Sequence, residues 1–119
     1  MEQTGHEVVV DLRLPWAPEA VDESRAALAK VRGLRGVVED RLALLVTEVV
    51  GEAVRSSDGK SNGLTLKVVI DGHVRVEVRD AGAGFDPVAA SGGFGFKLLD
   101  HLADRWGAEP GVVWFELER

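Results

Sequence analysis

An aspartate followed by two spaced glycines is the part of the sequence best suited to chemistry. Asp80 ends a segment of alternating apolar and polar residues, and Gly82 and Gly84 follow it directly. A carboxylate at a strand end can accept hydrogen bonds from an exocyclic amine such as that of adenine. One charged hydrogen bond of this kind contributes about 1.5 to 3 kcal/mol. Because glycines permit positive φ and carry no Cβ, a ligand can reach the main chain. The segment therefore predicts a pocket for a nucleotide base.

A second glycine cluster lies a short distance further along the chain. Gly92, Gly93 and Gly95 come at the start of an apolar run with helical spacing, and Lys97 follows them. Free amides at a helix N-terminus, together with the helix dipole and a lysine, can bind a polyphosphate. Each cluster alone also fits an ordinary turn or helix entry. The two clusters in this order favour a nucleotide site.

A long amphipathic helix is predicted between residues 38 and 55. Its apolar residues recur at steps of three and four, and they are Leu42, Leu45, Val46, Val49 and Ala53. Glu48 and Glu52 are four residues apart, so they lie on the same side of the helix at the border of the apolar stripe. Either they serve the nucleotide site, or they form a solvated helix edge in which Arg55 pairs with Glu52.

The elements that must position these residues follow from the spacing of apolar residues and from turn signals. In chain order they are a strand over residues 7–14, a helix from 18 to 33, the helix 38–55, a hairpin of strands 64–70 and 74–80, a helix from 98 to 106, and a strand from 111 to 119. In the first strand, one face is expected to carry Val8, Val10, Leu12 and Leu14. The last helix is expected to include Trp106 and to stop at Gly107.

This order of elements predicts an α/β (α+β) two-layer sandwich. Alternating strands and helices with one apolar face pack most economically as a mostly antiparallel mixed sheet covered on one face by three helices. With 119 residues, the chain has room for one domain, expected to span residues 1–119.

Composition excludes several classes of function. Without cysteine, the chain has no disulfide, thiol nucleophile or cysteine-ligated zinc. A net charge of −6 argues against direct binding to nucleic acid or to an anionic membrane. The sequence contains no run of about 18 apolar residues, and its first residues lack the basic and apolar regions of a signal peptide. A cytoplasmic location is therefore expected.

Three motifs resemble those of one ATP-binding family. Asp80-Ala-Gly-Ala-Gly84 matches a D-x-G-x-G box, Gly93-Phe-Gly-Phe-Lys-Leu98 is similar to a G-x-G-L-x-L box, and the helix around Glu48 resembles an E-x-x-x-N box. In this order, and over nearly the whole chain, they are similar to the ATP-binding domain shared by gyrase B, sensor histidine kinases and MutL. This is the GHKL or Bergerat fold, also described as histidine-kinase-like.

Within that superfamily the chain looks most like the bacterial anti-sigma-factor serine/threonine-protein kinases. The resemblance implies that it binds ATP with Mg²⁺ and a sigma factor, and phosphorylates an anti-anti-sigma protein of the STAS class. Such proteins regulate transcription in stress responses. Glu48 would be the general base that accepts the hydroxyl proton. By analogy a homodimer is expected, with no direct contact to nucleic acid or membrane.

One position departs from the family pattern. The motif asparagine that would hold Mg²⁺ falls on Glu52. A glutamate can ligate Mg²⁺ through oxygen, but its negative charge near a triphosphate is unfavourable wherever the metal does not screen it. Three hypotheses stay open: a kinase with an altered metal ligand, a protein that binds nucleotide without transfer, and a degenerate GHKL domain acting as a non-catalytic partner-binding module. A scaffold without any ligand is a further alternative.

Overall fold

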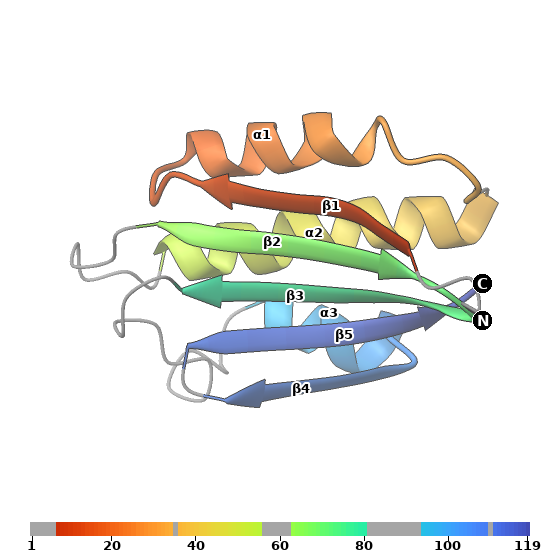
Figure 1. Cartoon of the computed structure of the whole chain (residues 1–119). Coiled ribbons are helices and arrows are strands. Elements are labelled where there is room, and N and C mark those ends of the chain that lie inside the picture. The colour runs from red at the N-terminus through yellow and green to blue at the C-terminus, as the bar shows by residue number, and fades with distance from the viewer. Residues whose placement is uncertain (1–6, 35, 56–62, 81–93, 110) are drawn as a thin grey trace.

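Five strands of alternating apolar residues form an antiparallel sheet with three helices packed on it (Figure 1). The computed structural model describes residues 7–34, 36–55, 63–80, 94–109 and 111–119. The strands are β1 (Glu7–Leu14), β2 (Leu64–Ile70), β3 (His73–Asp80), β4 (Arg105–Glu109) and β5 (Val112–Glu118), and the helices are α1 (Glu19–Leu28), α2 (Gly36–Arg55) and α3 (Phe94–Leu102). The predicted α+β class with a three-helix layer is confirmed.

The strands lie in the order β1-β2-β3-β5-β4, and every pairing between described strands is antiparallel. The expectation of a mixed sheet is therefore wrong for these five strands. The short strand β4 is the reason. The chain enters β4 after α3 and returns along β5, which pairs with β4 in the antiparallel direction at the sheet edge. As a result, β5 also runs antiparallel to β3. The radius of gyration of 13.6 Å is that of a compact chain of this length, about 13.5 Å.

The core lies between the sheet and the helices. Apolar side chains from the covered face of the sheet meet the buried stripe of α2, and the largest fully buried ones include Leu45, Leu64, Leu66, Leu99, Phe115 and Leu117. Burying one leucine side chain contributes about 1.5 to 3 kcal/mol. The described helices include none long and apolar enough to cross a lipid bilayer.

A register shift in β1 changes which face Val8 occupies. The Cα partners of Val8 and Val10 on β2 are the adjacent residues Val69 and Val68, so Val9 is an extra residue in the ladder. Because an extra residue reverses the alternation of faces, Val8 is 45% exposed whereas Val10 is buried. The prediction that Val8 shares a face with Val10, Leu12 and Leu14 is therefore wrong.

Two predicted helix ends also differ from the structure. The helix α1 ends at Leu28, after which Lys30 and Val31 donate backbone hydrogen bonds three residues back. The helix α3 ends at Leu102, and Trp106 lies in β4 rather than in a helix. Asp104 N–H donates to the Glu116 carbonyl at 3.0 Å, and this pairing begins the β4–β5 ladder.

Charged side chains cover the face of the sheet that no helix covers. The Glu116 carboxylate contacts Arg75 at 2.9 Å and Arg105 at 2.8 Å, from the neighbouring strands. The Arg75 guanidinium also lies 4.5 Å from the ring centroid of Trp114. An antiparallel sheet with one solvated face is expected to alternate in this way, so the second face needs no further layer.

Candidate functional site

Asp80 is a buried carboxylate at the last position of β3. It pairs with Leu64 across the β2–β3 ladder and is only 6% exposed. Because side chains alternate along a strand, Asp80 shares the covered face with Val76 and Val78, which are fully buried. Aspartate is almost never buried without partners. The carboxylate therefore lies in the covered layer at the end of β3, and its role in nucleotide binding stays a prediction.

The motif-bearing segments meet at one end of the sheet. Figure 1 shows the C-terminus of α2, the start of β2, the end of β3, the start of β5 and the start of α3 at the same end. The backbone N–H of Asp80 donates to the carbonyl of Gly111 at 2.8 Å, just before β5. Gly82, Gly84, Gly92 and Gly93 lie outside the described residues, although the described elements that flank them converge here.

The two glutamates of α2 are half-buried near its C-terminus. The Glu52 carboxylate accepts a hydrogen bond from Arg55 Nη2 at 3.0 Å, and the two side chains are 13% and 60% exposed. The predicted pairing of Arg55 with Glu52 is therefore present. The absence of a side chain at Gly51 leaves space for the Arg55 guanidinium, because a Cβ at this position would lie 3.2 Å from Arg55 Nη1.

Helix geometry places Glu48 and Glu52 away from α1. Glu39 lines a groove that α2 forms with α1, and Glu48 follows it by nine residues, or about two and a half turns. Glu48 therefore points to the opposite side of the helix. Since α2 packs against both α1 and α3, we infer that the two glutamates face the side on which α3 lies.

The helix predicted after the second glycine cluster is present as α3. It begins at Phe94, so Gly95 lies in its first turn. Lys97 is exposed, whereas Leu99 is fully buried in the core. The first four amides of a helix lack intrahelical partners, and those of α3 face the same end of the sheet as Asp80 (Figure 1).

The described residues give limited support for a metal site. Among them, no group of three His, Asp or Glu side chains is close enough to hold an ion. Mg²⁺ is commonly held by one or two carboxylates and the phosphates of its nucleotide, so a single glutamate is a sufficient protein ligand. Glu52 could supply this single carboxylate, and metal binding would then require its ion pair with Arg55 to break.

A comparison with models of known protein families finds no match, and a comparison with curated proteins finds none either. The contact that sequence reasoning missed is the one between Asp80 and Gly111. A glycine before a strand signals a turn but not its partner, because the pairing of β3 with β5 brings these distant residues together.

Proposed function

We propose that this protein is an ATP-binding anti-sigma factor with protein-serine/threonine kinase activity. It binds a sigma factor and phosphorylates a STAS-type anti-anti-sigma protein. The observation that carries the proposal is the buried Asp80 at the sheet end where α2 and α3 also end or begin. In this proposal residues 1–119 form one cytoplasmic domain of the histidine-kinase-like, or Bergerat, ATPase fold.

Each candidate residue has a role in binding. Asp80 accepts a hydrogen bond from the adenine amine, and Gly82 and Gly84 let the base approach the main chain. The first turn of α3, which contains Gly95, directs its free amides toward the phosphates. Gly92, Gly93 and the positive charge of Lys97 complete the predicted phosphate site.

Glu48 is the proposed general base. It accepts the proton of the attacking serine or threonine hydroxyl as the oxygen attacks the γ-phosphorus and the ADP oxygen departs. Bound Mg²⁺ would neutralise charge on the phosphates. Glu52 would hold the metal, and this role requires separation from Arg55.

A second candidate function is a degenerate GHKL domain that binds partners without catalysis. The ion pair between Glu52 and Arg55 favours it, because a carboxylate engaged with a guanidinium is a poorer metal ligand than a free one. In this alternative the fold and the binding partners are the same, but the protein does not transfer phosphate from ATP.

Phosphotransfer from labelled ATP to a cognate STAS protein, with Mg²⁺ present, tests the proposal. We expect transfer by the unchanged protein and a loss of about 10²- to 10⁴-fold in Glu48→Gln, because a general base contributes that much. Nucleotide affinity, measured by calorimetry, should be the same in both proteins. Absence of transfer by the unchanged protein, together with transfer by Glu52→Asn, would reject the kinase and favour the non-catalytic module.

A further inference from the structure

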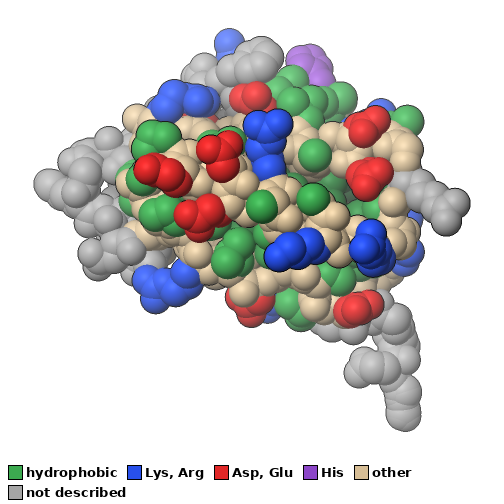
Figure 2. All heavy atoms as spheres, turned by 90° about the horizontal axis from the view of Figure 1, so that it is seen from above, with side chains coloured by type: hydrophobic (Ala, Val, Ile, Leu, Met, Phe, Trp, Pro, Cys, Tyr) green, Lys and Arg blue, Asp and Glu red, His purple; other side chains and the backbone are tan. Residues whose placement is uncertain are grey.

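Two exposed apolar side chains lie on the outer side of α2. Among the described residues, the exposed large apolar side chains are Val8, Val37 and Leu44, at 45%, 62% and 42%. Apolar side chains between charged ones, as in the view from above (Figure 2), are ordinary on a protein surface. Val37 and Leu44, however, are seven residues apart on one helix, so they are separated by about 20° around its axis. These two residues define the outer ridge of α2.

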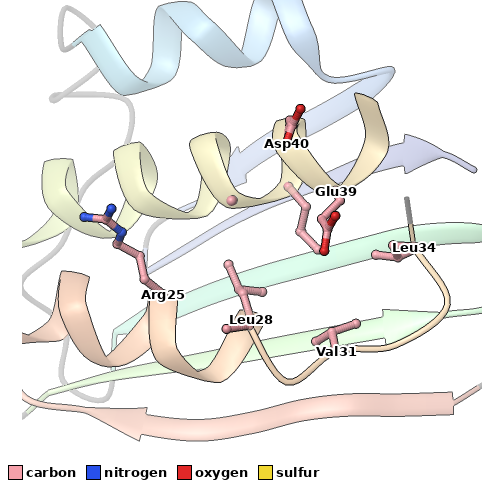
Figure 3. A pocket seen from close by; sticks show the side chains of 9 residues that line it. Arg25, Leu28, Val31, Leu34, Glu39 and Asp40 are labelled. Carbon is pink, nitrogen blue, oxygen red and sulfur yellow. The ribbon is translucent and has the colours of Figure 1, made fainter. Parts of the chain in front are cut away.

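The outer ridge of α2 does not face the groove between α1 and α2. Figure 3 shows the Glu39 side chain directed into that groove. Val37 comes two residues earlier, so its side chain is turned by about 200° from that of Glu39. Beside Leu44 lies a separate hollow of about 250 Å³, which Arg25, Ala43 and Thr47 also line. The ridge is therefore open to solvent and has a recess next to it.

The proposed general base lies on the same side of the helix as the ridge. Leu44 precedes Glu48 by four residues and Val37 precedes it by eleven, so they are turned from it by about 40° and about 20°. Along the helix axis they lie about 6 Å and about 16 Å from Glu48. The ridge thus leads along α2 directly to the residue that would accept the proton.

A protein substrate that uses Glu48 must cover this part of α2. Its hydroxyl oxygen has to come within about 3 Å of the Glu48 carboxylate. A specific interface covers about 800 Å² on each partner, which corresponds to a disc of about 16 Å radius. Centred on Glu48, such a disc contains Leu44 and reaches Val37. The nucleotide does not reach them, because its proposed site lies at the sheet end near the C-terminus of α2, whereas Val37 is in the first turn.

We propose that the outer ridge of α2 is the docking surface for the phosphate-accepting STAS-type protein. This assignment depends on the proposed function, because the occupant is the substrate of that reaction. An apolar surface of the partner covers Val37 and Leu44, and one of its side chains enters the hollow beside Leu44. Docking there places the segment that carries the acceptor hydroxyl over Glu48.

Steady-state phosphotransfer to a cognate STAS protein, with ATP and Mg²⁺ present, tests this surface. Leu44→Asp and Val37→Asp should each raise KM for the STAS protein at least about fivefold, because each replaces an apolar contact with a charge. The kcat and the affinity for ATP should stay unchanged, since neither residue touches the reacting groups. Leu44→Ala should raise KM in the same direction, and circular dichroism should show that all variants are folded.

Val8→Asp is the matched control. Val8 is exposed to a similar extent as Leu44, but it lies on β1 rather than on the helix that carries Glu48. This variant should leave KM for the STAS protein unchanged.

Crosslinking tests the same surface without phosphotransfer. Because the chain has no cysteine, a Leu44→Cys variant can carry a single photoactivatable benzophenone on the ridge. Illumination with the STAS protein should give a crosslinked product from position 44. The same label on a Val8→Cys variant should give none.

The two experiments separate failure of the docking surface from failure of the kinase. Transfer with an unchanged KM in the Leu44 and Val37 variants would overturn the docking surface and leave the kinase standing. Absence of transfer, together with crosslinking at position 44 alone, would reject the kinase and support docking by a non-catalytic module. Absence of crosslinking at position 44, or equal crosslinking at positions 44 and 8, would overturn the docking surface whether or not transfer occurs.

Discussion

At the scale of single residues, the burial of Asp80 is the observation with the greatest functional weight. Its neighbours on the covered face of β3 are valines, and a carboxylate among them loses hydration that must be replaced by hydrogen bonds. The exposed Asp11 carries the same group on β1 without that cost. Asp11 is therefore a suitable control residue for a binding test of Asp80.

Replacing Asp80 with asparagine is predicted to weaken ATP binding by about 5- to 13-fold, because a charged hydrogen bond of about 1.5 to 3 kcal/mol becomes a neutral one of about 0.5 to 1.5 kcal/mol. Isothermal calorimetry with ATP measures the change. Asp11→Asn should leave the affinity unchanged. Equal ATP affinities in the Asp80→Asn variant and the unchanged protein would contradict the proposed role of Asp80 in binding.

Gly107 has a packing role that its position in the sequence does not reveal. A Cβ at this position would lie 2.6 Å from Trp114 Nε1 and 2.8 Å from two further atoms of the indole. The indole ring thus occupies the space above the glycine. It also stacks with the Arg75 guanidinium, so a displaced ring would lose a second contact.

Gly107→Ala is predicted to lower the free energy of unfolding by about 1 to 3 kcal/mol, the usual cost of overpacking. Urea denaturation followed by tryptophan fluorescence measures it. Gly72→Ala is the control, since nothing lies within 4 Å of a Cβ built there. A loss no larger than that of the control would show that Trp114 moves aside without cost.

At the scale of elements, α2 is the centre of the helical layer. It packs on α1, α3 and the sheet, and its apolar stripe is buried over most of its length. Adjacent residues on this helix have opposite environments, because each step turns the side chain by about 100°. Leu45 is fully buried, whereas Leu44 is 42% exposed. One helix thus serves the core and a free surface.

Leu45→Ala is predicted to destabilise the fold by about 2 to 5 kcal/mol through lost burial and a cavity. Leu44→Ala should change stability by about 0.5 kcal/mol or less, as is usual for surface positions. Chemical denaturation at low micromolar protein concentration compares the two variants. Similar losses in both would contradict the assigned orientation of α2.

At the scale of the whole molecule, one face of the sheet is exposed to solvent and the other packs against the helices. The charged ladder of Arg75, Glu116 and Arg105 gives one side a solvated surface. The other side supports the helical layer, with the proposed nucleotide site at one end of the sheet and the groove between α1 and α2 on the layer's outer side. A ligand at the sheet end would therefore hold several elements together at once.

ATP is predicted to stabilise the whole fold. At about 100 times its dissociation constant, a ligand that binds only the folded state adds about 2.7 kcal/mol to the free energy of unfolding. The melting temperature, followed by circular dichroism, should rise with ATP concentration. It should rise much less in Asp80→Asn at the same ATP concentrations. A melting temperature that ATP does not change would reject nucleotide binding.

Local signals in the sequence were enough to predict most elements and their order. The strand β1, the hairpin of β2 and β3, and the helix α2 follow from apolar spacing and from the Asp71-Gly72 turn. The same spacing failed at β4, where Trp106 continues a helical pattern but lies in a strand. Pairing with β5 decides the conformation there, and a pairing partner distant in sequence leaves no local signal.

Residue types and their spacing alone indicated Asp80, Glu48 and Glu52 as candidates for chemistry. Only the tertiary structure decided that Asp80 is buried, that Arg55 engages Glu52, and that Arg25 and Glu39 line one groove between α1 and α2 (Figure 3). The physical reason is that periodicity reports the face on which a side chain lies, whereas burial and charge partners depend on which elements pack together. That packing is a property of the folded chain as a whole.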